Sequence, residues 1–335
     1  MEDDAPETPP ETRPPPVPLT RNVPLLWALV ALAVAGLTCV AALVGLRVSL
    51  GARPAFLDAM PTGAAPQSTP PRARSGALVL AGSGSNLPLT RALVSAFLTT
   101  HKDARVVVPE SIGSSGGVRA VRDGAIDVGL ISRPLNAEEA KLGLTVIPYA
   151  RVPVVVAANP TVPERCVATA DLPALWSGEK SRWSDGSRAV VLQRETGDSS
   201  FLAVSRRVPG LDEQNKAAYR VARWRVLYDD RSMQEALMAT EGAIGIFDLG
   251  AILAQRLPIR VLCVDGVPPS LEGVASGAYP YFKDLALVTS GPGDARRADM
   301  LAFLASPEGR ALTASLGYVP LPLAESAPAA NGGAP

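Results

Sequence analysis

Short apolar runs alternate with helix-like stretches along most of the chain. Residues 77–82 and 126–132 are rich in aliphatic and β-branched side chains, as buried strands are. Residues 87–101 and 116–124 instead place apolar side chains at helical spacing. This alternation predicts an α/β fold with a mostly parallel sheet.

A longer apolar stretch at 144–159 predicts an extended strand, and the alternation then continues to about residue 323. The span from 76 to 323 is long enough for a single barrel or for two lobes of ordinary size. Hydrophobic periodicity alone leaves both arrangements open.

The N-terminal part has a different pattern. Residues 1–22 are rich in proline and acidic side chains, so we expect them to be disordered. Residues 23–49 carry no charge before Arg47, and an apolar run of about 20 residues spans a bilayer. We expect a transmembrane signal anchor here, because a cleaved signal peptide would have a shorter apolar core followed by a small-residue cleavage site. Residues 50–75, rich in Pro, Ala, Gly and Ser, are expected to form a linker, and residues 324–335 a disordered C-terminus.

The composition argues against several classes of function and site. The 32 basic residues are matched by 32 acidic ones, so the basic surplus typical of nucleic-acid-binding proteins is missing. A single histidine, His101, and three scattered cysteines argue against a His-rich or zinc-cluster site. His101 lies at the end of a predicted helix, so we expect no nucleophile–histidine pair. We therefore expect no catalytic residues, no metal, no cofactor and no nucleic-acid partner.

Three predicted strand-to-helix turns carry the residues of an anion site, and ligands of open α/β sheets bind at such turns. They are AGSGSNLPLT at 81–90, SIGSSGGVRAV at 111–121 and VLQRETGDSSFLAV at 191–204. Glycine turn chemistry and helix capping would also explain each of these turns taken alone. A surface ion pair would explain Arg194 taken alone. Together they favour a tetrahedral oxyanion, which needs donors from several directions.

The set and order of these turns resemble the periplasmic phosphate-binding protein family (PstS) of Pst-type ABC phosphate transporters. The resemblance covers residues 77–323, and its most specific segment is IGSSGGVRAVRDGAIDVGLISRPL at 112–135. The turns GSGSNLP and RETGDSS and the later segments GAIGIFD, SGAYPYFKDLALV and SPEGRALTASLGYVPL also match. The resemblance implies a two-lobed periplasmic-binding-protein fold that closes about a hinge, with lobe 1 at about 76–156 and 265–323 and lobe 2 at about 157–264.

The resemblance also implies a set of ligand contacts. Carried over residue by residue, they fall on Ser85, Asn86, the backbone N–H of Leu87, Ser114, Arg194, Asp198, Ser199 and Ser200.

Two positions depart from the family pattern. Arg133 stands where an aspartate often accepts the proton of hydrogen phosphate, and an arginine has no acceptor. Asp198 stands where a serine is usual. We hypothesise that Asp198 accepts the phosphate proton and that Arg133 adds a charged donor. The alternatives are that Asp198 and Arg133 pair with each other, or that Asp198 caps its own helix.

The resemblance implies a membrane-tethered phosphate or oxyanion receptor that serves ABC permease subunits. We place it in the bacterial inner membrane as a single-pass protein with its large domain outside; the flanking arginines alone are nearly balanced between the two sides. An extracytoplasmic sensor or interaction protein of the same fold is the alternative, and a phosphatase is a weaker one. Cys166 and Cys263 would form a disulfide in an oxidising compartment or remain two buried thiols.

Overall fold

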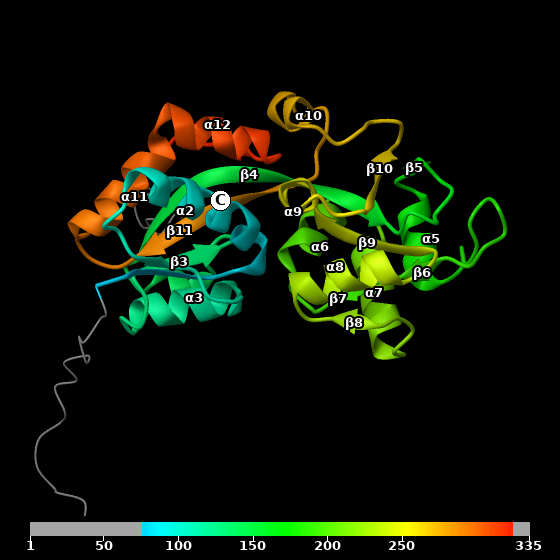
Figure 1. The fold of residues 1–335 in the computed structure, drawn as a ribbon. Helices are drawn as coiled ribbons and strands as arrows, with labels where there is room; N and C mark the ends of the chain where they lie inside the picture. The colour runs from blue at the N-terminus through cyan, green and yellow to red at the C-terminus, as the bar shows by residue number, and fades with distance from the viewer. Residues whose placement is uncertain (1–75, 324–335) are drawn as a thin grey trace, which may run out of the picture. The chain divides into compact units, whose positions relative to one another are not determined.

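The computed structural model describes residues 76–323, which form a two-lobed α/β structure (Figure 1). The expected tail at 1–22, signal anchor at 23–49, linker at 50–75 and C-terminal segment at 324–335 lie outside the described residues. Among residues 76–323, no helix is both long and apolar enough to cross a membrane.

The first lobe follows the predicted alternation of strands and helices. Strand β1 pairs in parallel with β2 on one side and with β3 on the other, and the intervening helices return the chain to the same edge of the sheet. The elements before the crossing are β1 (Leu78–Gly82), η1 (Gly84–Asn86), α2 (Leu87–Thr100), β2 (Val106–Val107), α3 (Gly113–Arg122), β3 (Val128–Ile131) and α4 (Ala137–Ala140).

The second lobe contains a mixed sheet and a separate pair of short parallel strands, β7 and β8. Helices α6 and α8 follow those two strands directly in the sequence. The elements are β5 (Cys166–Val167), α5 (Asp171–Ser177), β6 (Val190–Val191), β7 (Gln193–Arg194), α6 (Ser199–Ser205), α7 (Leu211–Arg220), β8 (Val226–Leu227), α8 (Asp230–Ala239), β9 (Ala243–Asp248), α9 (Leu249–Gln255), β10 (Arg260–Val264) and α10 (Leu271–Ser276).

Two long strands, β4 (Thr145–Ala158) and β11 (Phe282–Thr289), connect the lobes (Figure 1). On β4, Val152 packs in the core of the first lobe and Val154 in that of the second. Strand β11 pairs with β4 from Thr145 to Pro153, and the remainder of β4 pairs with β9 and β10, so the lobes share one continuous sheet. The chain then ends in the first lobe with α11 (Ala295–Ala305), α12 (Pro307–Ser315) and β12 (Val319–Pro320).

The sheet is mixed, and the prediction of a mostly parallel sheet was wrong. Both linking strands pair antiparallel with each other, β11 also runs antiparallel to β3, and β4 runs antiparallel to β9 and β10. Parallel pairing is found only in the outer parts of the lobes among the described residues. The reason is topological: a strand that crosses between lobes and a strand that returns must run in opposite directions.

The return to the first lobe also occurs later than the expected position of about 265. Val274, Tyr279 and Tyr281 still pack in the core of the second lobe, whereas Leu285 packs in that of the first. The crossing point is therefore within β11 rather than before α10.

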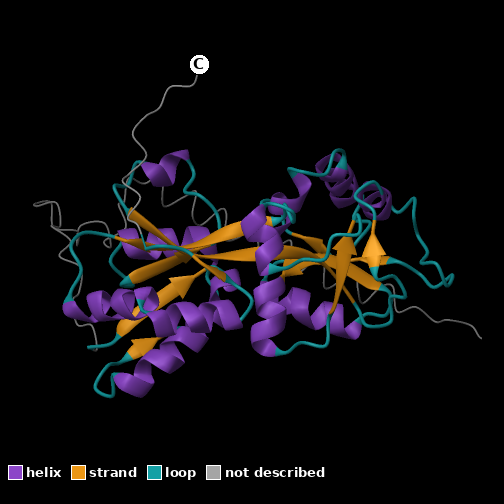
Figure 2. Cartoon of the chain, turned by 90° about the horizontal axis from the view of Figure 1, so that it is seen from above, coloured by secondary structure: helices purple, strands orange, loops and turns teal. Residues whose placement is uncertain are grey.

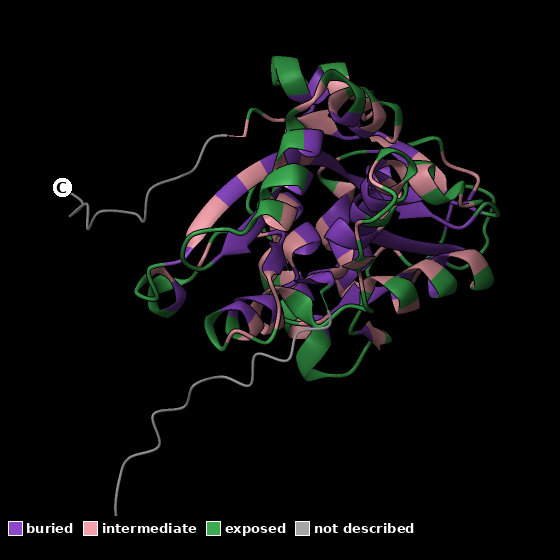
Figure 3. Ribbon diagram, turned by 60° about the vertical axis from the view of Figure 1, so that its left-hand side comes forward, coloured by how far each residue is buried: buried purple, intermediate pink, exposed green. Residues whose placement is uncertain are grey.

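Helices lie on both sides of the strands (Figure 2). The strands are mostly buried and the helices turn exposed residues outward (Figure 3). Val154, Val155 and Val156 on β4 are fully buried, which explains why this segment reads as a continuous apolar run without alternation.

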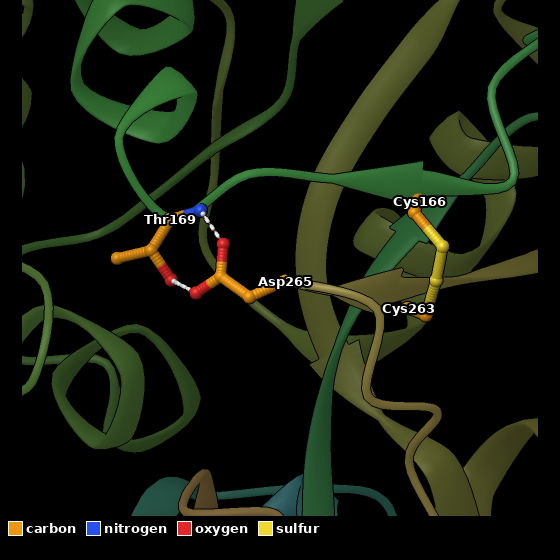
Figure 4. Close-up of a disulfide and its surroundings, with 4 residues drawn as sticks. All are labelled: Cys166, Thr169, Cys263 and Asp265. Atoms are coloured by element: carbon orange, nitrogen blue, oxygen red, sulfur yellow. Dashed lines mark hydrogen bonds between the residues drawn. A yellow bond between two sulfur atoms is a disulfide. The ribbon is translucent and has the colours of Figure 1, made fainter.

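Cys166 and Cys263 form a disulfide between neighbouring parallel strands β5 and β10 (Figure 4). Of the two alternatives left open by the sequence, the structure shows the disulfide. The pair lies near the surface, since Cys166 is exposed, and it links residues 97 positions apart. Close by, Asp265 accepts hydrogen bonds from the Thr169 backbone N–H and hydroxyl, which ties the same two chain segments together (Figure 4).

Replacing Cys166 and Cys263 together with serine is expected to lower the free energy of unfolding by about 2–4 kcal/mol, because the unfolded chain regains a long loop. Urea unfolding of the oxidised protein measures the change. Cys39→Ser is the matched control, since it leaves the pair intact. An equal loss in the control, or no loss in the double variant, would contradict the stabilising role of the bond.

Candidate functional site

A cavity of about 540 Å³ opens between the two lobes, and strand-to-helix turns form its wall. The turns that follow β1, β2 and β3 line it from the first lobe, and those that follow β7 and β8 line it from the second. The carboxyl ends of parallel strands therefore face the same space, which is where α/β sheets bind ligands. All three turns singled out from the sequence contribute to this wall.

Arg194, the last residue of β7, is the buried cation of the cavity wall, with 6% of its surface exposed. Its guanidinium lies 3.0 Å from the Asp198 carboxylate and 3.2 Å from that of Asp230. Burial lowers its pKa but the carboxylates raise it further, so the net direction is upward and the group stays charged. Its Nε is itself buried and has no hydrogen-bond partner among the described residues.

Serine hydroxyls line the back of the cavity. Ser83 Oγ lies 2.8 Å from Ser132 Oγ, which in turn lies 2.9 Å from Ser199 Oγ. The chain of hydroxyls passes from the first lobe to the second, because Ser199 is the first residue of α6. Ser85, from the same turn as Ser83, is buried beside them.

The first turn of α3 faces the cavity with residues 113–116. Its N-cap residue, Ile112, makes no side-chain cap, but the Gly113 N–H donates to the Ser111 hydroxyl at 3.3 Å. The first N–H groups of a helix have no partner within the helix, and the helix dipole adds partial positive charge there. The Ser114 hydroxyl lies at this turn and accepts a hydrogen bond from the Ser132 N–H.

Arg133 lines the cavity but is held by its own lobe. Its guanidinium donates to both oxygens of Glu139, at 2.7 and 2.8 Å, and to the Ser115 hydroxyl. The hydrogen bond from Arg133 lowers the pKa of Glu139. Arg133 therefore does not pair with Asp198, which was one of the alternatives considered from the sequence.

Asp198 is the N-cap of helix α6, which is the second alternative considered from the sequence. Its Oδ1 accepts from the Phe201 N–H at 2.8 Å, while its Oδ2 faces Arg194. The carboxylate thus has both a structural partner and a charged one, and it still lines the cavity.

Three residues expected as ligand contacts do not line this cavity. Asn86 is fully buried and its amide donates to the Tyr149 hydroxyl. The backbone N–H of Leu87 donates to the Gly84 carbonyl and its side chain joins the core of the first lobe. Ser200 donates to Asp248 behind the cavity.

The sequence analysis missed several wall residues. Ser83 lies in the turn at 81–90 and Ser132 in the segment at 112–135, but neither was predicted as a ligand contact. Asp230 follows the short strand β8 at the start of α8, so the strand-to-helix rule used for the other turns would have found it. Gly84 approaches this carboxylate so closely that an added Cβ would lie 2.2 Å from Asp230 Oδ2.

The cavity wall has slightly more negative than positive side chains. Three arginines and four carboxylates line it: Arg119, Arg133, Arg194, Glu195, Asp198, Asp229 and Asp230. Burial raises the pKa of Asp230, against the lowering effects of Arg194 and Lys283, and burial also raises the pKa of Glu195. Among residues 76–323, no group of three or more His, Cys, Asp or Glu is placed to hold a metal ion.

Comparison with known proteins agrees with this architecture. The chain is 24% identical to the phosphate-binding protein PstS of Bacillus subtilis over 254 residues, which are 74% of this chain and 81% of that protein. It is 26% identical to protein SphX of Synechococcus elongatus over 272 residues, 73% of this chain and 78% of that one.

A solved structure from Clostridium perfringens, described as a phosphate ABC transporter substrate-binding protein with bound phosphate, has the same fold. Its TM-score is 0.63 at 21% identity, over 73% of this chain and 99% of that chain. A sequence model of the PBP superfamily domain matches residues 66–308. The chain therefore belongs to the PBP superfamily.

Proposed function

We propose that this chain binds phosphate, or a closely related tetrahedral oxyanion, in the cavity between its lobes and delivers it to an ABC transporter. The observation that carries the proposal is buried Arg194, which lines the same cavity as the serine hydroxyls and the start of α3 and whose Nε has no partner among the described residues. A buried arginine donor with no partner is costly, and an anion would satisfy it.

The donors approach from several directions, as a tetrahedral anion requires. Arg194 comes from the second lobe, whereas Ser83, Ser85 and Ser114 come from three positions on the first. We propose these four residues, with the N–H groups at the start of α3, as the ligand contacts. The names of the relatives support phosphate as the anion.

The carboxylates require the anion to carry a proton. A fully ionised oxyanion beside Asp198 and Asp230 would meet like charges in a poorly solvated cavity, whereas hydrogen phosphate donates a hydrogen bond to a carboxylate. We propose Asp198 as the acceptor, because its Oδ2 lies at the cavity wall beside Arg194. Sulfate has no proton at neutral pH, so this contact would favour phosphate.

Asp198→Asn is expected to narrow the preference for phosphate over sulfate by about tenfold, since one charged hydrogen-bond acceptor is lost. Asparagine also caps helices well, so the contact with the Phe201 N–H remains. Competition titrations of both anions measure the ratio. If phosphate affinity and the ratio both stay unchanged, Asp198 is not the proton acceptor.

Placement outside the cytoplasm is part of the same proposal. Disulfides persist in oxidising compartments, and the Cys166–Cys263 bond fits that setting. We propose that residues 23–49 tether the domain to the membrane, close to the transporter that it would serve.

Isothermal titration of the full chain in mild detergent, stripped of bound anion, tests the proposal with phosphate and then sulfate at two pH values. Tight phosphate binding with weak sulfate binding supports a phosphate receptor. Comparable binding of both anions would indicate a less selective oxyanion receptor. Binding of neither would refute the proposal and leave a sensor or interaction protein built on this fold.

A further inference from the structure

A buried lysine lies directly behind the cavity, at the point where the lobes meet. Lys283 is on the linking strand β11 and has 7% of its surface exposed. Its Nζ lies 2.7 Å from Ser85 Oγ in the first lobe, and 3.1 and 2.6 Å from Ser199 Oγ and Ser200 Oγ in the second. The Asp248 carboxylate, at 3.0 Å, balances its charge.

An ammonium group donates hydrogen bonds and accepts none. The hydroxyl protons of Ser85, Ser199 and Ser200 must therefore point away from Lys283. Ser200 directs its proton to Asp248, at 3.0 Å. The lysine thus fixes the orientation of three hydroxyl groups, two of which line the cavity.

The direction set by Lys283 extends through the hydroxyl chain. Either oxygen can be the donor in the Ser199–Ser132 and Ser132–Ser83 pairs, and a Ser199 hydroxyl that turns a lone pair to the ammonium can donate to Ser132, which can then donate to Ser83. No further acceptor for the Ser83 hydroxyl proton is present among residues 76–323, and the same holds for Ser85. Both serines line the cavity, so both hydroxyls can donate into it.

We infer that Lys283 is a positioning residue that makes Ser83 and Ser85 present hydrogen-bond donors to the ligand, and so selects an anion without contacting it. The inference rests on the proposed function. In the absence of the ammonium, each hydroxyl in the chain could turn either way, and the cavity would present acceptors as readily as donors. Because Asp248 balances the charge of Lys283, the effect acts through hydroxyl orientation more than through net charge.

The test compares variants in an Asp248→Asn background, so that removing Lys283 does not leave the Asp248 carboxylate buried without its cation. Asp248→Asn keeps the ammonium and supplies the reference affinity for phosphate. Adding Lys283→Gln, whose amide both donates and accepts, is expected to weaken phosphate binding at least about tenfold relative to that reference, since two donors to an anion lose their fixed direction. Adding Lys283→Arg instead restores a donor-only cation and is expected to keep the affinity within about threefold of the reference.

Calorimetric titration of the full chain with inorganic phosphate gives the affinities, and thermal unfolding without phosphate shows that each variant is folded. Equal affinities for D248N and K283Q/D248N would overturn the inference while wild-type binding upholds the proposed function. Loss of binding in both double variants, with both folded, would assign Lys283 a role in packing rather than in hydroxyl orientation and would also overturn it. A wild-type chain that binds neither phosphate nor sulfate would overturn the proposed function, and the inference with it.

Discussion

Replacing Arg194 with glutamine is expected to weaken phosphate binding by about hundredfold or more. The change removes the buried cation of the cavity and leaves the carboxylates of Asp198 and Asp230 facing any incoming anion without a counter-charge. Loss of a charged hydrogen bond costs about 1.5–3 kcal/mol, and the unpaired buried carboxylates add to that. Calorimetric titration of the variant and the wild type with phosphate measures the effect.

Arg119→Gln is the matched control for this prediction. Arg119 is an exposed arginine on the wall of the same cavity, so the same charge is removed from a solvated position. We expect a loss of about threefold, because exposed charges are screened by water and salt. Equal losses in both variants would mean that net charge, rather than the buried guanidinium, governs binding.

Stability and binding can be separated at this position. Arg194→Gln leaves the buried carboxylate of Asp198 and the half-buried one of Asp230 without their cation and should also lower the free energy of unfolding. Adding Asp230→Asn removes one of these charges and should restore part of the stability, while the guanidinium donors stay absent. Restored stability without restored binding would assign the binding loss to Arg194 itself.

The sequence predicted the elements of the fold better than their directions. Helical spacing of apolar residues located α2 and α3, and continuous apolar runs located β1, β3 and the long strand β4. The same spacing holds no information about which way a buried strand runs. The antiparallel pairing of β4 and β11 depends on contacts between residues more than 120 positions apart, such as Pro153 and Phe282.

The candidate site was predictable where a turn joins a strand to a helix. Ser85, Ser114, Arg194 and Asp198 were found in this way, and the structure places all four on one cavity wall. The sequence does not show which way neighbouring side chains point. Ser199 and Ser200 are consecutive at the start of α6, yet Ser199 lines the cavity and Ser200 faces Asp248 behind it.

The lysine behind the site was not recognised from the sequence. Lys283 stands beside Asp284 in a mostly apolar strand, and a charged residue in such a strand usually indicates an edge or exposed position. Its partners come from three separate segments, so only the folded chain brings them together. A lysine within a mostly buried linking strand is the signal that would have indicated it.

Gly82 connects the packing of the first lobe to the geometry of the cavity. It ends β1 opposite Leu130 of β3, with φ of 154°. A Cβ at this position would lie 2.1 Å from the Leu130 carbonyl oxygen and 2.7 Å from its nitrogen. The Leu130 carbonyl also accepts the Ser83 N–H, and the Gly82 carbonyl accepts both the Ser111 hydroxyl and the Ile112 N–H.

Gly82→Ala is therefore expected to lower the free energy of unfolding by about 3 kcal/mol and to weaken phosphate binding, because both strands must separate and Ser83 moves with them. Chemical denaturation and phosphate titration measure the two effects. Gly143→Ala is the control: Gly143 has φ of 65° but nothing lies within 4 Å of an added Cβ. That variant should lose only about 1 kcal/mol from backbone strain and should bind phosphate normally. Similar losses in both variants would show that backbone conformation, and not the close approach of β1 to β3, limits the residue at position 82.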